Sequence, residues 1–169
     1  MHGMLHSPVD VPDPTAGHAD QYRPLGAYAG LITAFNAGFA GFLIAAGRKR
    51  RLPERYGAGD LALLTVATFK LSRLITKDRV TSGLRAPFTR FQDDAGHGEV
   101  DEAARGRGLQ RAIGELLVCD YCMGQWVAAG MLGLLAVAPR EARAVAATFT
   151  VYAGADALQL GWSRFEEAG

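Results

Sequence analysis

The sequence predicts an all-α fold, a multi-pass bundle of three or four transmembrane helices with a cytoplasmic basic loop. Charged residues gather in short blocks that separate long apolar stretches, although the mean hydropathy of the 169 residues is only +0.06. The 21 glycines and the low aromatic content of 9% favour helices that pack closely through small side chains. Both patterns are typical of a helical membrane domain, here predicted over residues 25–163.

Residues 1–24 precede this domain and predict a disordered tail. They contain three aspartates and four prolines, and Arg23 is their only Arg or Lys. A secretory signal peptide needs a basic start that runs into a short apolar core, so this segment does not resemble one. Its polar, proline-rich composition cannot bury enough apolar surface to fold.

The first predicted membrane segment is 25–47, which carries no charged side chain. At about 1.5 Å per residue it is long enough to cross a hydrocarbon core of about 30 Å. Small residues recur three or four positions apart along it: Gly26, Gly30, Ala34, Ala37, Gly41 and Ala45. Such a face lets a second backbone approach closely, so a protein partner or a second copy of the chain can pack there.

Residues 48–55 follow as a basic block with five Lys or Arg side chains. A block of this kind beside a membrane segment normally lies in the cytoplasm and attracts anionic lipid headgroups. Nucleic acid is not expected as a partner, because no aromatic platform accompanies the block and the net charge of the chain is only +1.

The second segment, 59–76, is ambiguous. Its uninterrupted apolar run, 61–69, is too short to cross a bilayer, and Lys70 and Arg73 follow at helical spacing. If their stems extend toward the interface, the whole segment can cross. Crossing and dipping back on the same side both remain open.

Residues 77–112 predict a cytoplasmic loop that is amphipathic at its start and polar afterwards. Apolar and arginine side chains alternate there, which suits a segment lying in the headgroup plane. Residues 93–98 carry two aspartates and two glycines and are expected to be flexible. The predicted lipid- or partner-contacting residues are Arg79, Arg85, Arg90 and Phe88.

Cys119 and Cys122 form a Cys-x-x-Cys pair where the third segment, 120–138, begins. Unpaired N–H groups and the positive end of a helix dipole favour the thiolate at such a position. The pair is therefore a candidate redox site, a candidate metal site or a packed turn. Zinc prefers four ligands, so two cysteines supply half of a site, and no cofactor is predicted.

The fourth segment, 144–162, contains a single charged residue, Asp156. An ionisable residue inside a membrane segment normally faces the bundle and has a partner. The candidate partners are Lys70 and Arg73. Such an ion pair can set the register of the helices or mark a proton or substrate path.

The distribution of Lys and Arg ranks the possible topologies. Four crossings with the N-terminus inside place 11 of these residues in the cytoplasm and 7 outside. The alternative in which 59–76 does not cross gives 15 against 3. Both arrangements put the 77–112 loop and the cysteine pair in the cytoplasm, where we expect free thiols and no standing disulfide.

Two motifs resemble those of a family of small bacterial membrane proteins, catalogued as domain of unknown function thirteen-sixty, some of which are labelled sporulation proteins. One is the run from Phe69 to Phe88, and the other runs from Gly114 to Trp126. The resemblance covers about residues 60–160. This chain has Gly83 and Asp120 where the family often carries proline. The resemblance implies a multi-pass membrane protein, and it implies no activity.

The sequence thus predicts a multi-pass protein of the bacterial inner membrane. It contains no Gly-rich phosphate loop, nucleophile elbow or His-Glu-x-x-His motif. The leading hypothesis is a non-enzymatic accessory or scaffold protein. The alternatives are a thiol-redox or metal-thiolate protein that uses Cys119 and Cys122, and a small oligomeric transporter.

Overall fold

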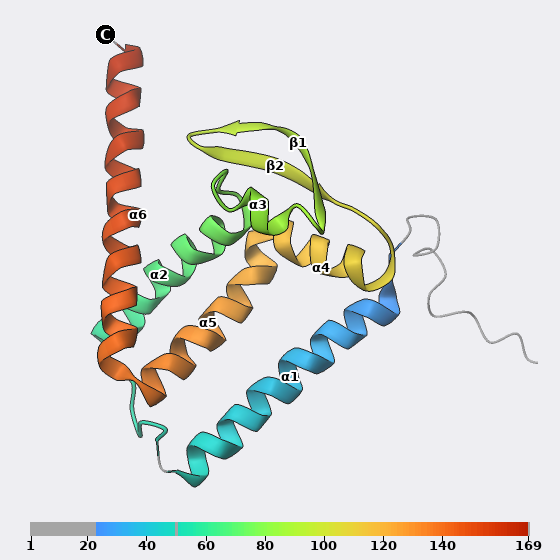
Figure 1. Cartoon of the computed structure of the whole chain (residues 1–169). Coiled ribbons are helices and arrows are strands. Elements are labelled where there is room, and N and C mark those ends of the chain that lie inside the picture. The colour runs from blue at the N-terminus through green and yellow to red at the C-terminus, as the bar shows by residue number, and fades with distance from the viewer. Residues whose placement is uncertain (1–22, 50, 169) are drawn as a thin grey trace, which may run out of the picture.

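The structure, a computed structural model, describes residues 23–49 and 51–168, so most of the predicted tail lies outside the described residues. The described part is mostly helical with one β-hairpin (Figure 1). In chain order the elements are α1 (Leu25–Arg48), α2 (Ala58–Thr76), α3 (Ser82–Arg85), β1 (Thr89–Gly96), β2 (Glu99–Ala104), α4 (Gly108–Val118), α5 (Asp120–Val137) and α6 (Pro139–Ala168).

Helices α2, α5 and α6 pack together and form the core. Ala67 of α2 meets Ala142 and Ala146 of α6, and none of the three has exposed surface. Leu64, Met131 and Leu135 complete the buried cluster. Alanines at the contact let the helix backbones approach closely, as the composition predicts.

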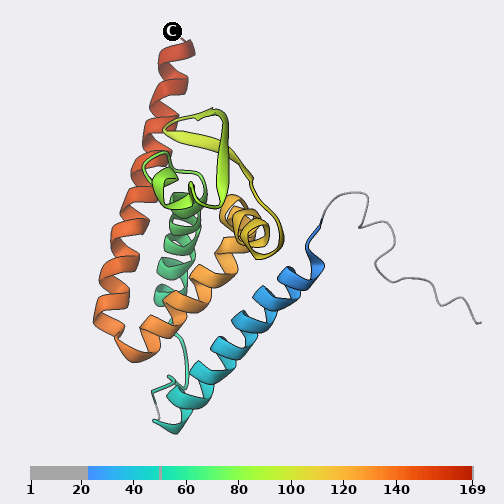
Figure 2. The same cartoon turned by 45° about the vertical axis from the view of Figure 1, so that its right-hand side comes forward.

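Helix α1 lies on the outside of this core, against α4 and α5 (Figure 2). The Phe35 ring meets the Trp126 ring edge to face, with centroids 5.0 Å apart. Further along, the ring of Phe42 lies against Gly133. Among the described residues α1 is the helix long and apolar enough to cross a membrane, and α4 with α5 qualifies only if the bent pair is one span.

Cross-helix contacts show which way each helix runs. Arg143, near the start of α6, makes two 2.8 Å hydrogen bonds to Asp60, near the start of α2. Toward the other end, Lys70 of α2 pairs with Asp156 of α6. Helices α2 and α6 are therefore parallel, and α1 and α5 run in the opposite direction (Figure 1).

The fourth predicted segment, 144–162, is longer in the structure, because α6 starts at Pro139 and extends to Ala168. Proline is tolerated there because the first helical residue has no N–H partner within the helix.

The prediction of an all-α fold is wrong for 77–112. This segment contains α3 and an antiparallel hairpin, paired from Thr89 and Ala104 to Gly96 and Glu99. Gly96, His97 and Gly98 have positive φ and form the turn, so 93–98 is ordered backbone. Glycine supplies this conformation at little cost.

Helix α4 carries the hairpin. Gly114 is buried under it, and a Cβ atom at this position would lie 2.3 Å from the Phe88 carbonyl oxygen and 3.0 Å from the Cβ of Ala104. Arg111 of α4 also donates a 3.4 Å hydrogen bond to the Ala104 carbonyl. The close approach of helix and hairpin therefore requires glycine at position 114.

We predict that Gly114→Ala lowers the thermal unfolding midpoint of the detergent-solubilised protein. Overpacking of this kind costs about 1–3 kcal/mol. Gly154→Ala in α6 is the matched control, because nothing lies within 4 Å of a Cβ there. An unchanged midpoint in Gly114→Ala would show that the hairpin does not pack on α4 as described.

Candidate functional site

The cysteine pair lies at the bend between α4 and α5, where the two helix axes meet at 85°. Cys119 is the N-cap of α5, and its Sγ accepts a 3.1 Å hydrogen bond from the backbone N–H of Cys122. The structure joins the two sulfurs in a disulfide. This differs from the expected free thiols, because the bend brings the side chains close enough to bond.

Two neighbours of the pair connect it to the rest of the molecule. Asp120 lies 3.6 Å from Arg73 of α2, and the same arginine donates two hydrogen bonds to Glu99 of the hairpin. On the other side, Cys122 lines a cavity of about 380 Å³ between α1 and the bend. The disulfide therefore lies between a charged cluster and a mostly apolar cavity.

The sequence predicts that Asp156 pairs with Lys70 or Arg73, and the structure brings only Lys70 to Asp156. The Lys70 ammonium also lies 3.9 Å from the centre of the Tyr152 ring. Such contacts compensate the desolvation of a buried amine. Arg73 instead pairs with Glu99 and Asp120.

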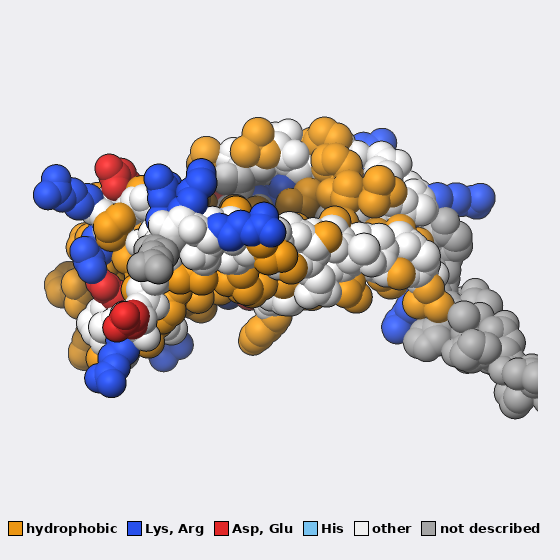
Figure 3. Space-filling view, turned by 90° about the horizontal axis from the view of Figure 1, so that it is seen from below, with side chains coloured by type: hydrophobic (Ala, Val, Ile, Leu, Met, Phe, Trp, Pro, Cys, Tyr) orange, Lys and Arg blue, Asp and Glu red, His pale blue; other side chains and the backbone are white. Residues whose placement is uncertain are grey.

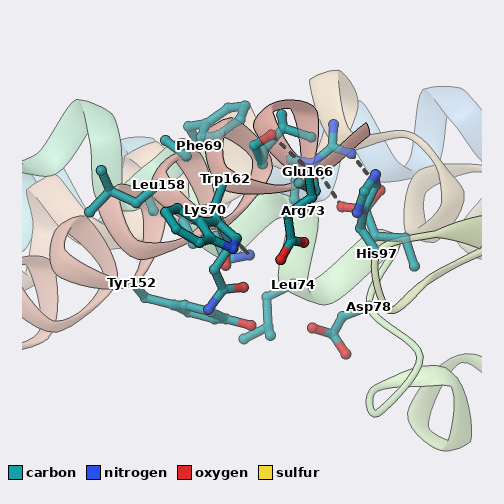
Figure 4. A pocket seen from close by; sticks show the side chains of 17 residues that line it. Phe69, Lys70, Arg73, Leu74, Asp78, His97, Tyr152, Leu158, Trp162 and Glu166 are labelled. Carbon is teal, nitrogen blue, oxygen red and sulfur yellow. Dashed lines mark hydrogen bonds and ion pairs between the residues drawn. The ribbon is translucent and has the colours of Figure 1, made fainter. Parts of the chain in front are cut away.

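A cavity of about 970 Å³ opens beside this pair, between α2, the hairpin turn and the C-terminal half of α6. In Figure 4 Lys70 lies near Tyr152 and Trp162, while His97 and Asp78 lie on the hairpin side. Its two basic side chains, Lys70 and Arg73, both have acidic partners. The cavity therefore offers no unpaired Lys or Arg to an anionic ligand.

The predicted lipid- or partner-contacting residues separate into two groups. Arg79 and Arg90 are exposed, and Phe88 is half-buried. The prediction for Arg85 is wrong, because this side chain is 1% exposed. The local pattern of alternating apolar and basic residues could not indicate its partner, because Glu102 lies in a separate strand, β2.

Arg85 is at the centre of a buried polar network. Its Nε donates to Glu102 at 2.8 Å, and its Nη1 donates to the Ile75 carbonyl at the end of α2, also at 2.8 Å. Ser82 and Thr89 donate to the same carboxylate at 2.5 and 2.8 Å. The hairpin, α3 and the end of α2 are thus held together by one cation and its partner.

This network shifts the titration of Glu102. Burial alone would raise the pKa of the carboxyl group, but hydrogen bonds from Arg85, Ser82 and Thr89 outweigh burial and lower the pKa below its usual value. The charged form is therefore the one that the folded protein stabilises.

Two further features from the sequence are the candidate metal site and the small-residue face of α1. No group of three or more His, Cys, Asp or Glu side chains there could hold a metal ion. On the small-residue face of α1, a Cβ atom at Gly26, Gly30 or Gly41 would meet nothing within 4 Å. Packing of that face against a partner or a second copy stays a prediction.

We predict that Glu102→Gln lowers the free energy of unfolding by roughly 3 kcal/mol or more, because it leaves the Arg85 charge buried and unpaired. Asp101→Asn, in the same strand, removes an exposed partner of Lys77 and should cost less than about 1 kcal/mol. Thermal unfolding of both variants measures the difference. Equal losses would contradict the central role of the network.

The same carboxylate predicts a pH dependence. Because its pKa is lowered in the folded state, its stabilisation is complete above the unfolded value, about 4.3, and is lost as pH falls through the folded pKa. The unfolding midpoint of the wild type should therefore fall more steeply in acid than that of Glu102→Gln. Parallel pH profiles would contradict this assignment.

Comparison with known proteins identifies the family. The family described as "Protein of unknown function (DUF1360)" matches residues 63–162. Sporulation protein YjcA of Bacillus subtilis (strain 168) is 34% identical over 86 residues, which cover 49% of this chain and 73% of that protein. No solved structure gives a significant match. The matched region contains both resembling motifs, the hairpin and the cysteine pair, and the chain belongs to the DUF1360 family.

Proposed function

We propose that this chain is a multi-pass integral protein of the bacterial inner membrane that acts as a non-enzymatic accessory or scaffold protein. The observation that carries the proposal is the amount of apolar surface that the helices turn outward. Exposed large apolar side chains include Ile32, Phe39, Leu43 and Ile44 on α1, Leu61 and Phe69 on α2, and Val151, Leu158 and Trp162 on α6. Apolar surface of this extent needs lipid or protein to cover it.

The directions of the helices support four crossings. Helix α2 is continuous, so segment 51–57 and the hairpin lie at opposite ends of the bundle (Figure 1). Seen from the end with segment 51–57, apolar side chains cover much of the helix surface, with Lys and Arg side chains among them (Figure 3). At about 1.5 Å per residue, α2 and α5 nearly match a core of about 30 Å. A continuous α2 of this length does not fit a second segment that enters the bilayer and returns to the same side.

The side chains around α3 suit the membrane surface at the hairpin end. Val80 is 90% exposed and Leu84 is 80% exposed, with the exposed Arg79 beside them. Apolar side chains next to a cation insert well among anionic headgroups. The rigid hairpin above them, with Arg90 and Phe91 exposed, is then free to contact a protein partner. The name of the Bacillus relative suggests sporulation as the process.

A thiol-redox role is the second candidate, and the disulfide at the α4–α5 bend favours it. On the cytoplasmic side, disulfides are usually transient and catalytic or redox-sensing. A transporter is the weaker alternative, because Asp156 is paired with Lys70 and is positioned to set helix register.

We predict that sites in segment 51–57 and in the hairpin are labelled from opposite sides of the membrane. Arg51→Cys and Asp101→Cys, each in a background with Cys119→Ser and Cys122→Ser, can be treated with a membrane-impermeant maleimide. Arg51→Cys should react in intact cells, because the topology with 11 Lys and Arg inside and 7 outside puts 51–57 outside, opposite to the cytoplasmic position that its basic block alone would favour. Asp101→Cys should react only after permeabilisation. Labelling of both from the same side would contradict four crossings.

We also predict that the purified protein in liposomes carries no proton current, and that Asp156→Asn does not change this result. The physical reason is that one paired carboxylate does not make a continuous path. A pH-sensitive dye inside the liposomes measures the flux. A wild-type flux that Asp156→Asn abolishes would contradict the accessory role and support the transporter.

A further inference from the structure

The cavity beside the disulfide has the size and lining of a small-molecule site. Its volume of about 380 Å³ lies within the usual range of about 300–1,000 Å³ for such sites. Tyr28, Phe35 and Trp126 supply aromatic walls, and Cys122 forms part of the lining. A flat ring bound there would therefore lie against aromatic side chains and next to sulfur.

Polar groups in the same cavity suit a ligand with carbonyl oxygens. Asn36 of α1 and Gln125 of α5 both line it, and each amide group can donate two hydrogen bonds. Tyr28 donates a hydrogen bond to Glu115, which also pairs with Arg111 at 3.0 Å. The lining thus combines an apolar slot with amide donors for carbonyl groups, beside a carboxylate that Tyr28 and Arg111 already engage.

The position of the cavity indicates where its ligand comes from. One wall is α1, and only 6% of the most apolar stretch of that helix is buried inside the molecule. In the proposed topology the surroundings of α1 are lipid, so a hydrophobic molecule can enter sideways from the bilayer. In the same topology, water-soluble thiol reagents approach the pair from the hairpin end.

We propose that this cavity binds a lipid-soluble quinone, which oxidises the Cys119–Cys122 dithiol to the disulfide. The proposal deepens the thiol-redox candidate and rests on it; a quinone-oxidised dithiol would make the chain a thiol oxidoreductase in place of the non-enzymatic role. A quinone fits because it is flat, carries two carbonyl acceptors, dissolves in the bilayer and takes up two electrons and two protons. These are the electrons and protons that a dithiol releases when it closes.

The chemistry balances in two steps. The Cys122 thiolate, at the cavity wall, adds to a ring carbon of the quinone, and a quinone oxygen takes up one proton. The Cys119 thiolate then attacks the Cys122 sulfur, so that the S–S bond forms and the C–S bond breaks. The bonding pair returns to the ring, which takes the second proton and leaves as hydroquinone. Two thiols and one quinone thus give one disulfide and one hydroquinone.

The helix terminus assists the second step. Cys119 caps α5, and its sulfur accepts the backbone N–H of Cys122. This hydrogen bond and the positive end of the helix favour the thiolate at Cys119, which is the attacking group. The three-residue spacing keeps that sulfur within bonding distance of Cys122. The two cysteines therefore have different roles.

The experiment uses the full-length protein in lipid nanodiscs, reduced and freed of reductant, with a decyl-substituted benzoquinone as the oxidant. Thiol titration and the ultraviolet absorbance of the quinone are followed together. We expect the loss of two thiols for each hydroquinone formed. Leu31→Trp should slow the reaction about tenfold or more, because the new ring fills the cavity and displaces the quinone from Cys122. Leu43→Trp, on the same helix outside the cavity, should react at the wild-type rate.

Single-cysteine variants test the order of the steps. With Cys119→Ser the quinone should remain attached to Cys122, and mass spectrometry should find the adduct. With Cys122→Ser no adduct should form at Cys119. Equal rates for Leu31→Trp and Leu43→Trp, or equal adducts on both cysteines, would overturn the proposal. The maleimide topology result does not depend on these outcomes, so failure of the quinone site leaves the membrane placement to be judged separately.

Discussion

The buried ion pair between Arg85 and Glu102 is the interaction on which the hairpin end of the molecule depends. Taking either charge out of water alone would cost several kcal/mol, so each is stable only with its partner in place. Arg85 also donates to the backbone carbonyls of Ile75 and Asp78. Helix α2 and the hairpin are therefore held in one relative position, since any displacement would leave a buried charge unpaired.

The fixed position of the hairpin also helps to position the residues beside the cysteine pair. Because β2 is held at Glu102, Glu99 in the same strand reaches Arg73 of α2. Arg73 lies 3.6 Å from Asp120, the first residue of α5 and the neighbour of Cys119. A series of charge pairs thus connects the buried network to the α4–α5 bend. Loss of Glu102 should disturb the geometry around the disulfide as well as the hairpin.

The sequence predicted the elements that depend on local pattern and missed those that depend on distant partners. Apolar runs placed α1, α2 and α5 within one or two residues, because apolar content and helix length are local properties. The hairpin was missed, since Asp93 and Asp94 are poor strand formers and β1 is stabilised by contacts with β2 and α4. Arg85 was predicted at the surface because its partner, Glu102, lies 17 positions away in the sequence. Lys70 and Asp156 were foreseeable because an ionisable residue in an apolar helix needs a partner.

The position of the disulfide relative to the membrane connects the fold to its chemistry. In the proposed topology of four crossings, the side with more Lys and Arg is the hairpin side, and cellular thiols reduce disulfides there. A disulfide on that side persists only if an oxidant reforms it as fast as it is reduced. The α4–α5 bend places Asp120, the neighbour of Cys119, beside Arg73, and it places Cys122 at a cavity bordered by α1. In the proposed topology, reductant from water and oxidant from the bilayer reach the same pair from different directions, which a cysteine pair on a straight surface helix would not allow.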